Sequence, residues 1–135
     1  MELVVNLEVA TASVNGWLDH KKIKAKKREA SKAFIDTMID AVSTGNLVVE
    51  DDFRLTMNLD FPIKGEVSEI STITFVPRIT DINKEPYRRS VKTDTFEGQM
   101  MLTLCALTKQ PIGVLKSLDE GTDKSLAEAI ALFFM

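Results

Sequence analysis

One stretch of nine residues constrains the fold of this chain more than any other part of its sequence. From Phe53 to Phe61, five apolar residues alternate with four polar residues without a break. A helix would scatter these apolar side chains around its circumference, whereas a β-strand places all five on one face. The stretch therefore predicts a strand with one buried face. Pro62 is predicted to end it, because proline cannot donate a hydrogen bond to a neighbouring strand.

Two shorter stretches predict partners for this strand. The apolar run Leu47–Val49 is followed by Asp51-Asp52, a pair typical of a turn, and so predicts a hairpin with residues 53–61. The stretch Val67–Val76 is rich in Thr and Ile, and it predicts a further strand that Pro77 closes. A central antiparallel sheet of three to four strands is therefore expected.

The first 45 residues predict one strand and one amphipathic helix. Over Glu2–Ala10, apolar residues alternate with other residues, which predicts a strand, and a loop with the turn dipeptide Asn15-Gly16 is expected over residues 11–16. The helix is expected over residues 25–44, with Gly45 just beyond its end. Its apolar stripe comprises Phe34, Ile35, Met38, Ile39 and Val42.

The C-terminal third predicts a group of helices packed together. The first carries Phe96, Met100, Leu104 and Leu107 on one face, and Pro111 ends it and begins a short second helix. A last helix is expected after Thr122 or Asp123 as N-cap, and its face comprises Leu126, Ala129, Ile130 and Phe133. The segment Asp81–Lys92 has no periodicity and contains Pro86, so it is predicted to be a loop.

This order of elements predicts an α+β fold in a single domain, residues 1–135. The length fits one domain of about 100–200 residues, and 44% hydrophobic with 27% charged residues is typical of a globular chain. We expect a strand plus helix in residues 1–50, the central strands in 51–80 and a helical part in 95–135. Strands in the middle and helices at the end favour an antiparallel sheet. Whether residues 1–50 join that sheet stays open.

The sequence offers little support for catalysis, a metal or a cofactor. The common phosphate-binding and nucleophile motifs are absent. Cys105 lies in an apolar helix stripe, where a small buried residue is expected, and His20 lies beside lysines, as a surface group does. The acidic run Glu50–Asp52 lacks the spacing of a calcium loop. We therefore expect a protein that is not an enzyme, with no cofactor and no metal.

A dense basic run precedes the expected helix. Its six cations are Lys21, Lys22, Lys24, Lys26, Lys27 and Arg28. Such a run can contact nucleic acid, or it can be the solvated face of a helix. No aromatic residues interleave with it and the net charge of the chain is −3, so we favour the solvated face and do not expect nucleic acid as a partner.

Apolar residues also gather near the end of the sequence. The candidate surface for a partner or for self-association comprises Leu126, Ile130, Phe133, Phe134 and Met135. These side chains either close the hydrophobic core or meet another molecule, and both interpretations stay open. Self-association through them would give a homo-oligomer. No apolar run approaches the roughly 20 residues of a membrane span, so no membrane partner is expected.

From Phe53 onward the chain resembles the phage tail assembly chaperones, small proteins of long-tailed phages and prophages. The first block of resemblance is the strand 53–61 with Pro62-Ile63, then Gly65, then a second strand ending in Pro77-Arg78. The second block, Met101–Met135, contains the steps 104–111 and 114–119 and a closing helix. It departs from the family at Lys109-Gln110, where many members have glycine.

The resemblance implies a protein without enzymatic activity that acts in tail assembly. Family members bind the tape-measure protein and recruit tail tube subunits during tail morphogenesis, so the resemblance implies these two partners and the cytoplasm of the host cell. Two alternatives are kept. One is a structural tail protein, a tube or terminator subunit, that stays in the virion. The other is a small nucleic-acid-binding module that uses the basic run 21–28.

Overall fold

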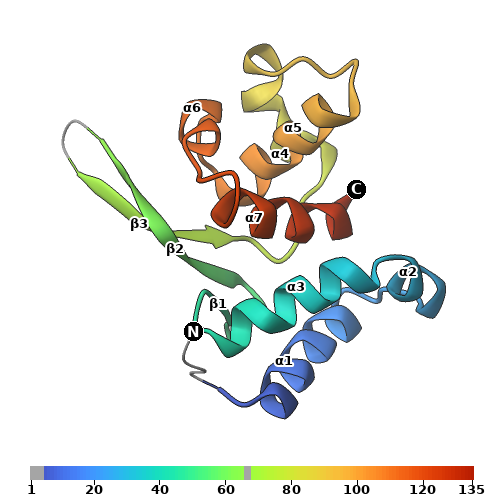
Figure 1. Ribbon diagram of the computed structural model, residues 1–135. Coiled ribbons are helices and arrows are strands. Elements are labelled where there is room, and N and C mark those ends of the chain that lie inside the picture. Colours follow the sequence, from blue (N-terminus) through green and yellow to red (C-terminus); the bar gives the residue numbers. More distant parts are fainter. Residues whose placement is uncertain (1–4, 66–67) are drawn as a thin grey trace.

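The structure of the chain is a computed structural model that describes residues 5–65 and 68–135 (Figure 1). The described residues form an α+β fold with an antiparallel sheet and C-terminal helices, as the sequence predicts. The elements, with η for 3₁₀ helices, are α1 (Leu7–His20), α2 (Ala25–Ala30), α3 (Lys32–Ser43), β1 (Leu47–Val49), β2 (Leu55–Lys64), β3 (Glu69–Phe75), α4 (Asp81–Lys84), η1 (Glu85–Ser90), α5 (Phe96–Thr108), α6 (Ile112–Lys116), α7 (Asp123–Ala131) and η2 (Leu132–Phe134).

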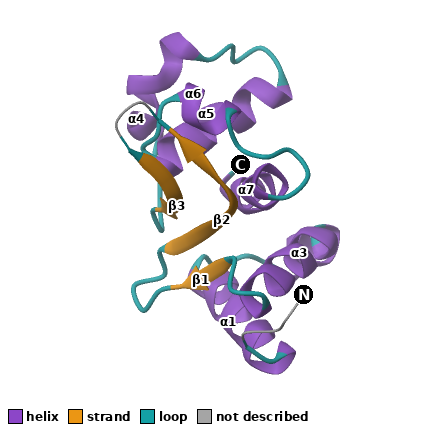
Figure 2. Cartoon of the chain, turned by 60° about the vertical axis from the view of Figure 1, so that its left-hand side comes forward, coloured by secondary structure: helices purple, strands orange, loops and turns teal. Residues whose placement is uncertain are grey.

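The three strands form one antiparallel sheet in the order β1-β2-β3. Leu47 of β1 faces Met57 of β2, and Leu55 of β2 faces Phe75 of β3. The alternation predicted for β2 is confirmed, because Leu55, Met57 and Leu59 are all buried. The sheet lies between the N-terminal helices and the C-terminal helices (Figure 2), so its buried side chains join both groups into one hydrophobic core.

The prediction that Pro62 ends the strand is wrong, and a bulge explains why. Asn58 pairs with Thr72 and Ile63 pairs with Ile70, so β2 advances five positions where β3 advances two. Pro62 lies in this bulge, where no partner on β3 requires its missing N–H, and β2 continues beyond it to residue 64. The outer part of the two strands (residues 60–65 and 68–71, hereafter the arm) projects away from the helices (Figure 1).

The predicted N-terminal strand is wrong wherever it can be compared with the structure. Residues 1–4 lie outside the described residues, and α1 begins at Leu7, inside the expected strand. The Asn6 side chain accepts a hydrogen bond from the Val9 N–H (2.9 Å) and caps the helix. The predicted loop over 11–16 also lies within α1. Helical spacing prevails because it buries one continuous face, which comprises Ala10, Val14, Trp17 and Leu18.

The single helix expected over residues 25–44 is divided at Ser31 into α2 and α3. α3 packs beside α1 and buries Met38 and Val42 from the predicted stripe, whereas Phe34 is exposed. Its end is as predicted. Gly45 has a positive φ of 83°, and the N–H groups of Gly45 and Asn46 return to carbonyls of the last turn, which is the usual glycine-terminated helix end.

The expected C-terminal helices are α5, α6 and α7, and α5 is the most deeply buried of them. Every residue from Met100 to Thr108 is buried, although Phe96, expected on the inner face, is exposed at the first position of the helix. Pro111 precedes α6, and α7 begins after Thr122, as predicted. The predicted loop over 81–92 is wrong in part, because α4 and η1 occupy residues 81–90.

A buried carboxylate fastens α7 to the sheet. Asp123, the first residue of α7, is 3% exposed, and its two oxygens accept the backbone N–H groups of Asp60 (2.8 Å) and Phe61 (3.1 Å). Both N–H groups lie in the bulge of β2, where no paired residue of β3 is available. The carboxylate thus satisfies two donors that the irregular strand leaves without a strand partner, and it fixes where the arm begins.

Candidate functional site

The apolar residues near the end of the sequence divide between the core and the surface. Leu126, Ile130 and Phe133 are buried, so these three are part of the hydrophobic core and are not available to a partner in this structure. Phe133 meets Trp17 edge-to-face, with ring centroids 5.9 Å apart. Phe134 is half-buried against the same indole, and Met135 is 41% exposed. Only these last two side chains remain on the surface.

Half of the basic run makes contacts within the chain. The Lys21 ammonium lies 3.4 Å from the centre of the Phe134 ring, and Lys27 donates a hydrogen bond to the Met135 carbonyl oxygen (3.2 Å). Burial, with the nearby charges of Arg78 and Lys27, lowers the pKa of Lys21 to about 8. Arg28 donates to Asp19 (2.8 Å) and to the Ile23 carbonyl (2.8 Å). The run therefore holds the α1–α2 turn and the last residues of the chain.

The other half of the basic run faces solvent. Lys22, Lys24 and Lys26 are exposed, but they do not share one helix, because Lys22 and Lys24 belong to the turn between α1 and α2. Lys22 has a positive φ of 59°, which turns the chain sharply at this point. The structure therefore does not bring the six cations together into one continuous helix face.

The two residues considered for nucleophilic chemistry lie in different surroundings. Cys105 is fully buried in α5, and desolvation raises the pKa of its thiol to about 11. His20 stacks on Phe53 with ring centroids 4.0 Å apart and an interplanar angle of 6°. Each side chain therefore has a packing role, and the burial of the thiol keeps it in its unreactive protonated form.

The acidic turn between β1 and β2 is held by its own polar contacts. Asp52 pairs with Arg54 (2.9 Å), and Glu50 accepts a hydrogen bond from the Thr56 hydroxyl (2.9 Å). These residues line a hollow of about 530 Å³. Within residues 5–65 and 68–135, no three His, Cys, Asp or Glu side chains are grouped closely enough to hold a metal ion.

A second hollow has apolar walls and is the strongest candidate for a binding site. It measures about 490 Å³ and lies between the segment after β3, the α4–η1 unit and the end of α5, and we call it the Ile82 groove. The Ile82 side chain is 75% exposed, whereas isoleucine is usually buried in folded proteins. The lining residues are Val76, Arg78, Ile79, Ile82, Asn83, Pro86, Tyr87, Ala106 and Lys109.

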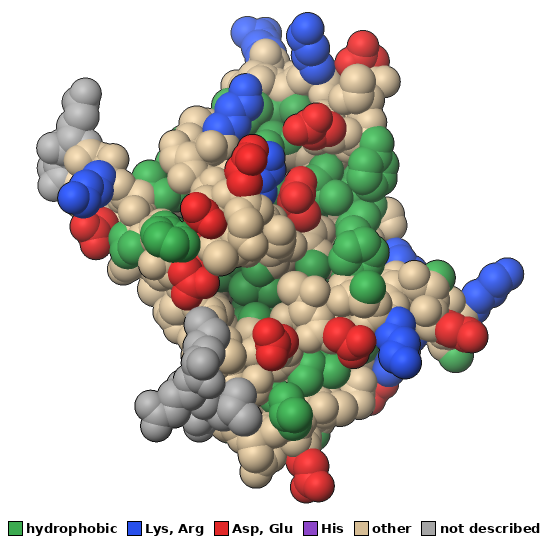
Figure 3. Space-filling model, viewed as in Figure 1, with side chains coloured by type: hydrophobic (Ala, Val, Ile, Leu, Met, Phe, Trp, Pro, Cys, Tyr) green, Lys and Arg blue, Asp and Glu red, His purple; other side chains and the backbone are tan. Residues whose placement is uncertain are grey.

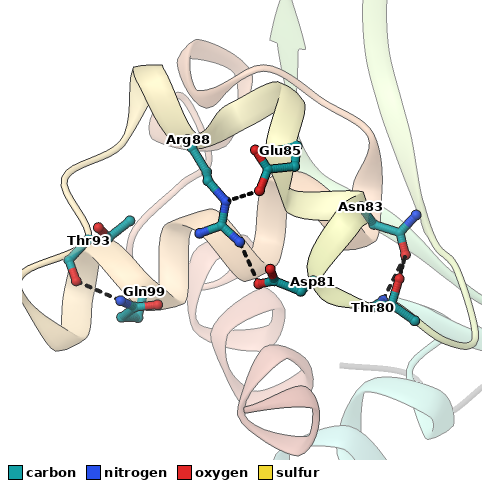
Figure 4. A network of polar contacts seen from close by, with 7 residues as sticks. All are labelled: Thr80, Asp81, Asn83, Glu85, Arg88, Thr93 and Gln99. Carbon is teal, nitrogen blue, oxygen red and sulfur yellow. Dashed lines mark hydrogen bonds and ion pairs between the residues drawn. The ribbon is translucent and has the colours of Figure 1, made fainter.

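Local polar contacts shape one wall of the Ile82 groove (Figure 4). Asn83 Oδ1 accepts the backbone N–H of Thr80 (2.7 Å), which closes a capping box at the start of α4. Arg88 donates to Glu85 (2.7 Å) and to Asp81, and the two carboxylates raise the pKa of its guanidinium. Because these groups satisfy one another, α4 and η1 keep their shape while Ile82 stays exposed.

Further apolar side chains are exposed far from this groove. Phe61, on the arm, is 57% exposed, and Phe96, at the start of α5, is 66% exposed. Figure 3 shows apolar side chains in separate patches among the charged groups on the face that it views. Aromatic residues are enriched where proteins contact one another, so Phe61 and Phe96 are candidates for such contacts.

Sequence reasoning missed the Ile82 groove because its walls come from segments far apart in the chain. The available signal was a set of large apolar residues, with Ile82 and Tyr87 inside the expected loop and Ile79 just before it. A loop of 12 residues that is exposed to water does not require large apolar side chains. Their presence indicated either local helices or a binding surface.

Comparisons with protein-family models, with curated proteins and with solved structures find no match to this chain. Among the described residues, no helix combines the length and the apolar character that crossing a membrane requires.

Proposed function

We propose that this chain is a phage tail assembly chaperone, which binds the tape-measure protein and recruits tail tube subunits in the host cell cytoplasm without catalysing a reaction. Two lines support the proposal. The first is the resemblance of the sequence from Phe53 onward. The second, which carries the proposal, is the exposure of large apolar side chains at separate places, namely Phe61, Ile82 and Phe96.

The physical task of such a chaperone suits this surface. A very long amphipathic helix exposes an apolar face along its whole length and aggregates unless that face is covered. Many copies of a small protein can cover it through weak contacts that repeat along the helix. Weak contacts also allow tube subunits to displace the chaperone copy by copy. Exposed apolar side chains at separate places, such as Phe61, Ile82 and Phe96, offer several weak contacts of this kind.

Co-expression with the long helical protein encoded beside this chain tests the proposal. We expect the wild-type chain to keep that protein soluble and to co-purify with it in many copies. Phe61→Glu should reduce the co-purified amount, because a charge on the arm opposes an apolar contact. Ala33→Glu, which adds the same charge at an exposed position of α3 outside the arm, is the matched control and should leave it unchanged. Precipitation of the long protein with wild-type chain present would contradict the proposal.

A structural tail subunit is the second candidate, and the arm favours it. β3 is the last strand of the sheet, and its outer edge pairs with no other strand in the described part of the chain. An open edge can pair with a second copy, as ring-forming subunits require. Mass spectrometry of purified particles separates the two candidates, because only a structural subunit should be present in stoichiometric amounts.

A further inference from the structure

We propose that the Ile82 groove binds an acidic amphipathic helix, with the apolar residues of that helix seated in the groove and its carboxylates paired with Arg78 and Lys109. The inference rests on the proposed function and deepens it, because it names the surface and the chemistry of the partner. The inference follows from three features of the groove. Its walls are apolar, its backbone offers no strand edge to an extended peptide, and its rim is positively charged.

The walls of the groove select for aliphatic side chains. Ile79, Ile82 and Pro86 contribute apolar surface along its length, and the ring of Tyr87 and the methyl group of Ala106 complete the wall. The volume of about 490 Å³ leaves room for more than one inserted side chain. Burial of Ile82 beneath a partner would remove an exposed aliphatic side chain from water, which drives association.

The backbone around the groove favours a helix over an extended peptide. A peptide that adds to a sheet needs a strand edge with free N–H and C=O groups. Here β3 ends at Phe75, and the next backbone N–H, that of Val76, already donates to the Leu107 carbonyl (3.0 Å). The walls that α4, η1 and α5 contribute are helical, so their backbone groups bond within their own turns. The remaining wall, residues 76–80, is neither strand nor helix, so it offers no regular strand edge to an extended peptide. A partner that satisfies its own backbone, as an α-helix does, therefore suits the groove better.

The charges around the groove select for acidic flanks on that helix. Arg78 and Lys109 are exposed, and neither forms an ion pair with a described residue. The nearby carboxylates of Asp81 and Glu85 both pair with Arg88, so these three groups together carry one negative charge against the two positive charges of Arg78 and Lys109. The rim of the groove therefore presents a net positive charge, which attracts a partner carrying glutamate or aspartate beside its apolar residues.

The backbone of Lys109 supports a role for its side chain. Lys109 ends α5 with a φ of 56° and a ψ of 31°, a left-handed conformation that glycine adopts more readily than any other residue. Glycine would satisfy the helix end equally well, since the hydrogen bond from the Lys109 N–H to the Cys105 carbonyl (2.8 Å) involves backbone only. Lysine at this position makes the fold less stable than glycine would, but it places a cation at the groove.

Fluorescence anisotropy with two synthetic helical peptides tests the inference. Both carry leucines at i, i+3, i+4 and i+7, and they differ only in having glutamates or lysines beside those leucines. We expect the glutamate peptide to bind the wild-type chain at least about tenfold more tightly, and added salt should reduce the difference. Equal affinity for the two peptides, or no binding of either, would overturn the inference.

Three variants and one control separate binding from folding. Ile82→Asp should abolish binding of the glutamate peptide, and Arg78→Glu should weaken it about tenfold or more. Lys109→Gly should weaken binding while leaving the melting temperature unchanged or higher, since glycine suits the left-handed position. The control is Lys32→Glu, a charge reversal at an exposed site outside the groove, and it should change nothing. Full binding by Ile82→Asp would overturn the inference.

The co-expression experiment distinguishes failure of this inference from failure of the proposed function. If the wild-type chain and Ile82→Asp both retain the long helical protein, the groove is not the contact, and the chaperone function stands. If the wild-type chain itself fails to retain it, the chaperone function fails. In that case the peptide measurements still decide whether the groove binds an acidic helix.

Discussion

Asp123→Ala tests how α7 is fastened to the sheet. The substitution removes both hydrogen bonds to the N–H groups of Asp60 and Phe61 (2.8 and 3.1 Å). A hydrogen bond to a charged acceptor contributes about 1.5–3 kcal/mol. Both bonds are only part-buried, so we take the lower figure for each bond. The free energy of unfolding should therefore fall by about 3 kcal/mol.

Urea denaturation followed by tryptophan fluorescence measures this loss. Trp17 is the only tryptophan of the chain and is buried, so its emission reports unfolding. Glu120→Ala is the matched control, because its carboxylate is 88% exposed and lies 3.9 Å from Lys124. That control should cost less than about 0.5 kcal/mol. A loss below about 1 kcal/mol for Asp123→Ala would refute the reasoning that its two bonds stabilise the bulge.

Three further predictions follow from buried groups. Phe133→Ala should lower the free energy of unfolding by about 3–5 kcal/mol in the same urea assay. Phe134→Ala should lower it by less, because Phe134 is only half-buried. The reverse order would contradict the assignment of Phe133 to the core. Burial lowers the pKa of Lys21 from 10.5 to about 8, so the unfolded chain binds more protons between these pH values. The free energy of unfolding should accordingly gain a contribution that rises with pH over that range, and Lys21→Met should remove it. Cys105, with a thiol pKa of about 11, should resist a thiol reagent at pH 8 until urea is added, and rapid labelling of the native chain would contradict its burial.

Much of the fold could be predicted from local pattern. The alternation over 53–61 is β2, the turn at Asp51-Asp52 joins it to β1, and Gly45 ends α3. The helices after Phe96 follow their apolar spacing. Each of these signals is local, since it depends on which face of one element is apolar or on a backbone conformation that one residue prefers.

The errors arose where two local signals competed. Residues 7–10 satisfy an alternating pattern, but Val14, Trp17 and Leu18 extend a helical face through them, and burial against α3 favours the helix. At Pro62 the rule for a regular strand does not apply, because a bulge supplies a position without a strand partner. Each outcome depends on what packs against the element, which a window of sequence does not contain.

The candidate site shows the same division. The amino-acid sequence by itself determined the α+β class, the alternating strand, the C-terminal helices and the presence of apolar residues between Arg78 and Tyr87. Only the tertiary structure decided that these residues meet Lys109 around a groove, and that Phe133 belongs to the core while Met135 is exposed. The physical reason is that burial and charge compensation are properties of neighbours in space, and packing brings those neighbours together from segments far apart in the chain.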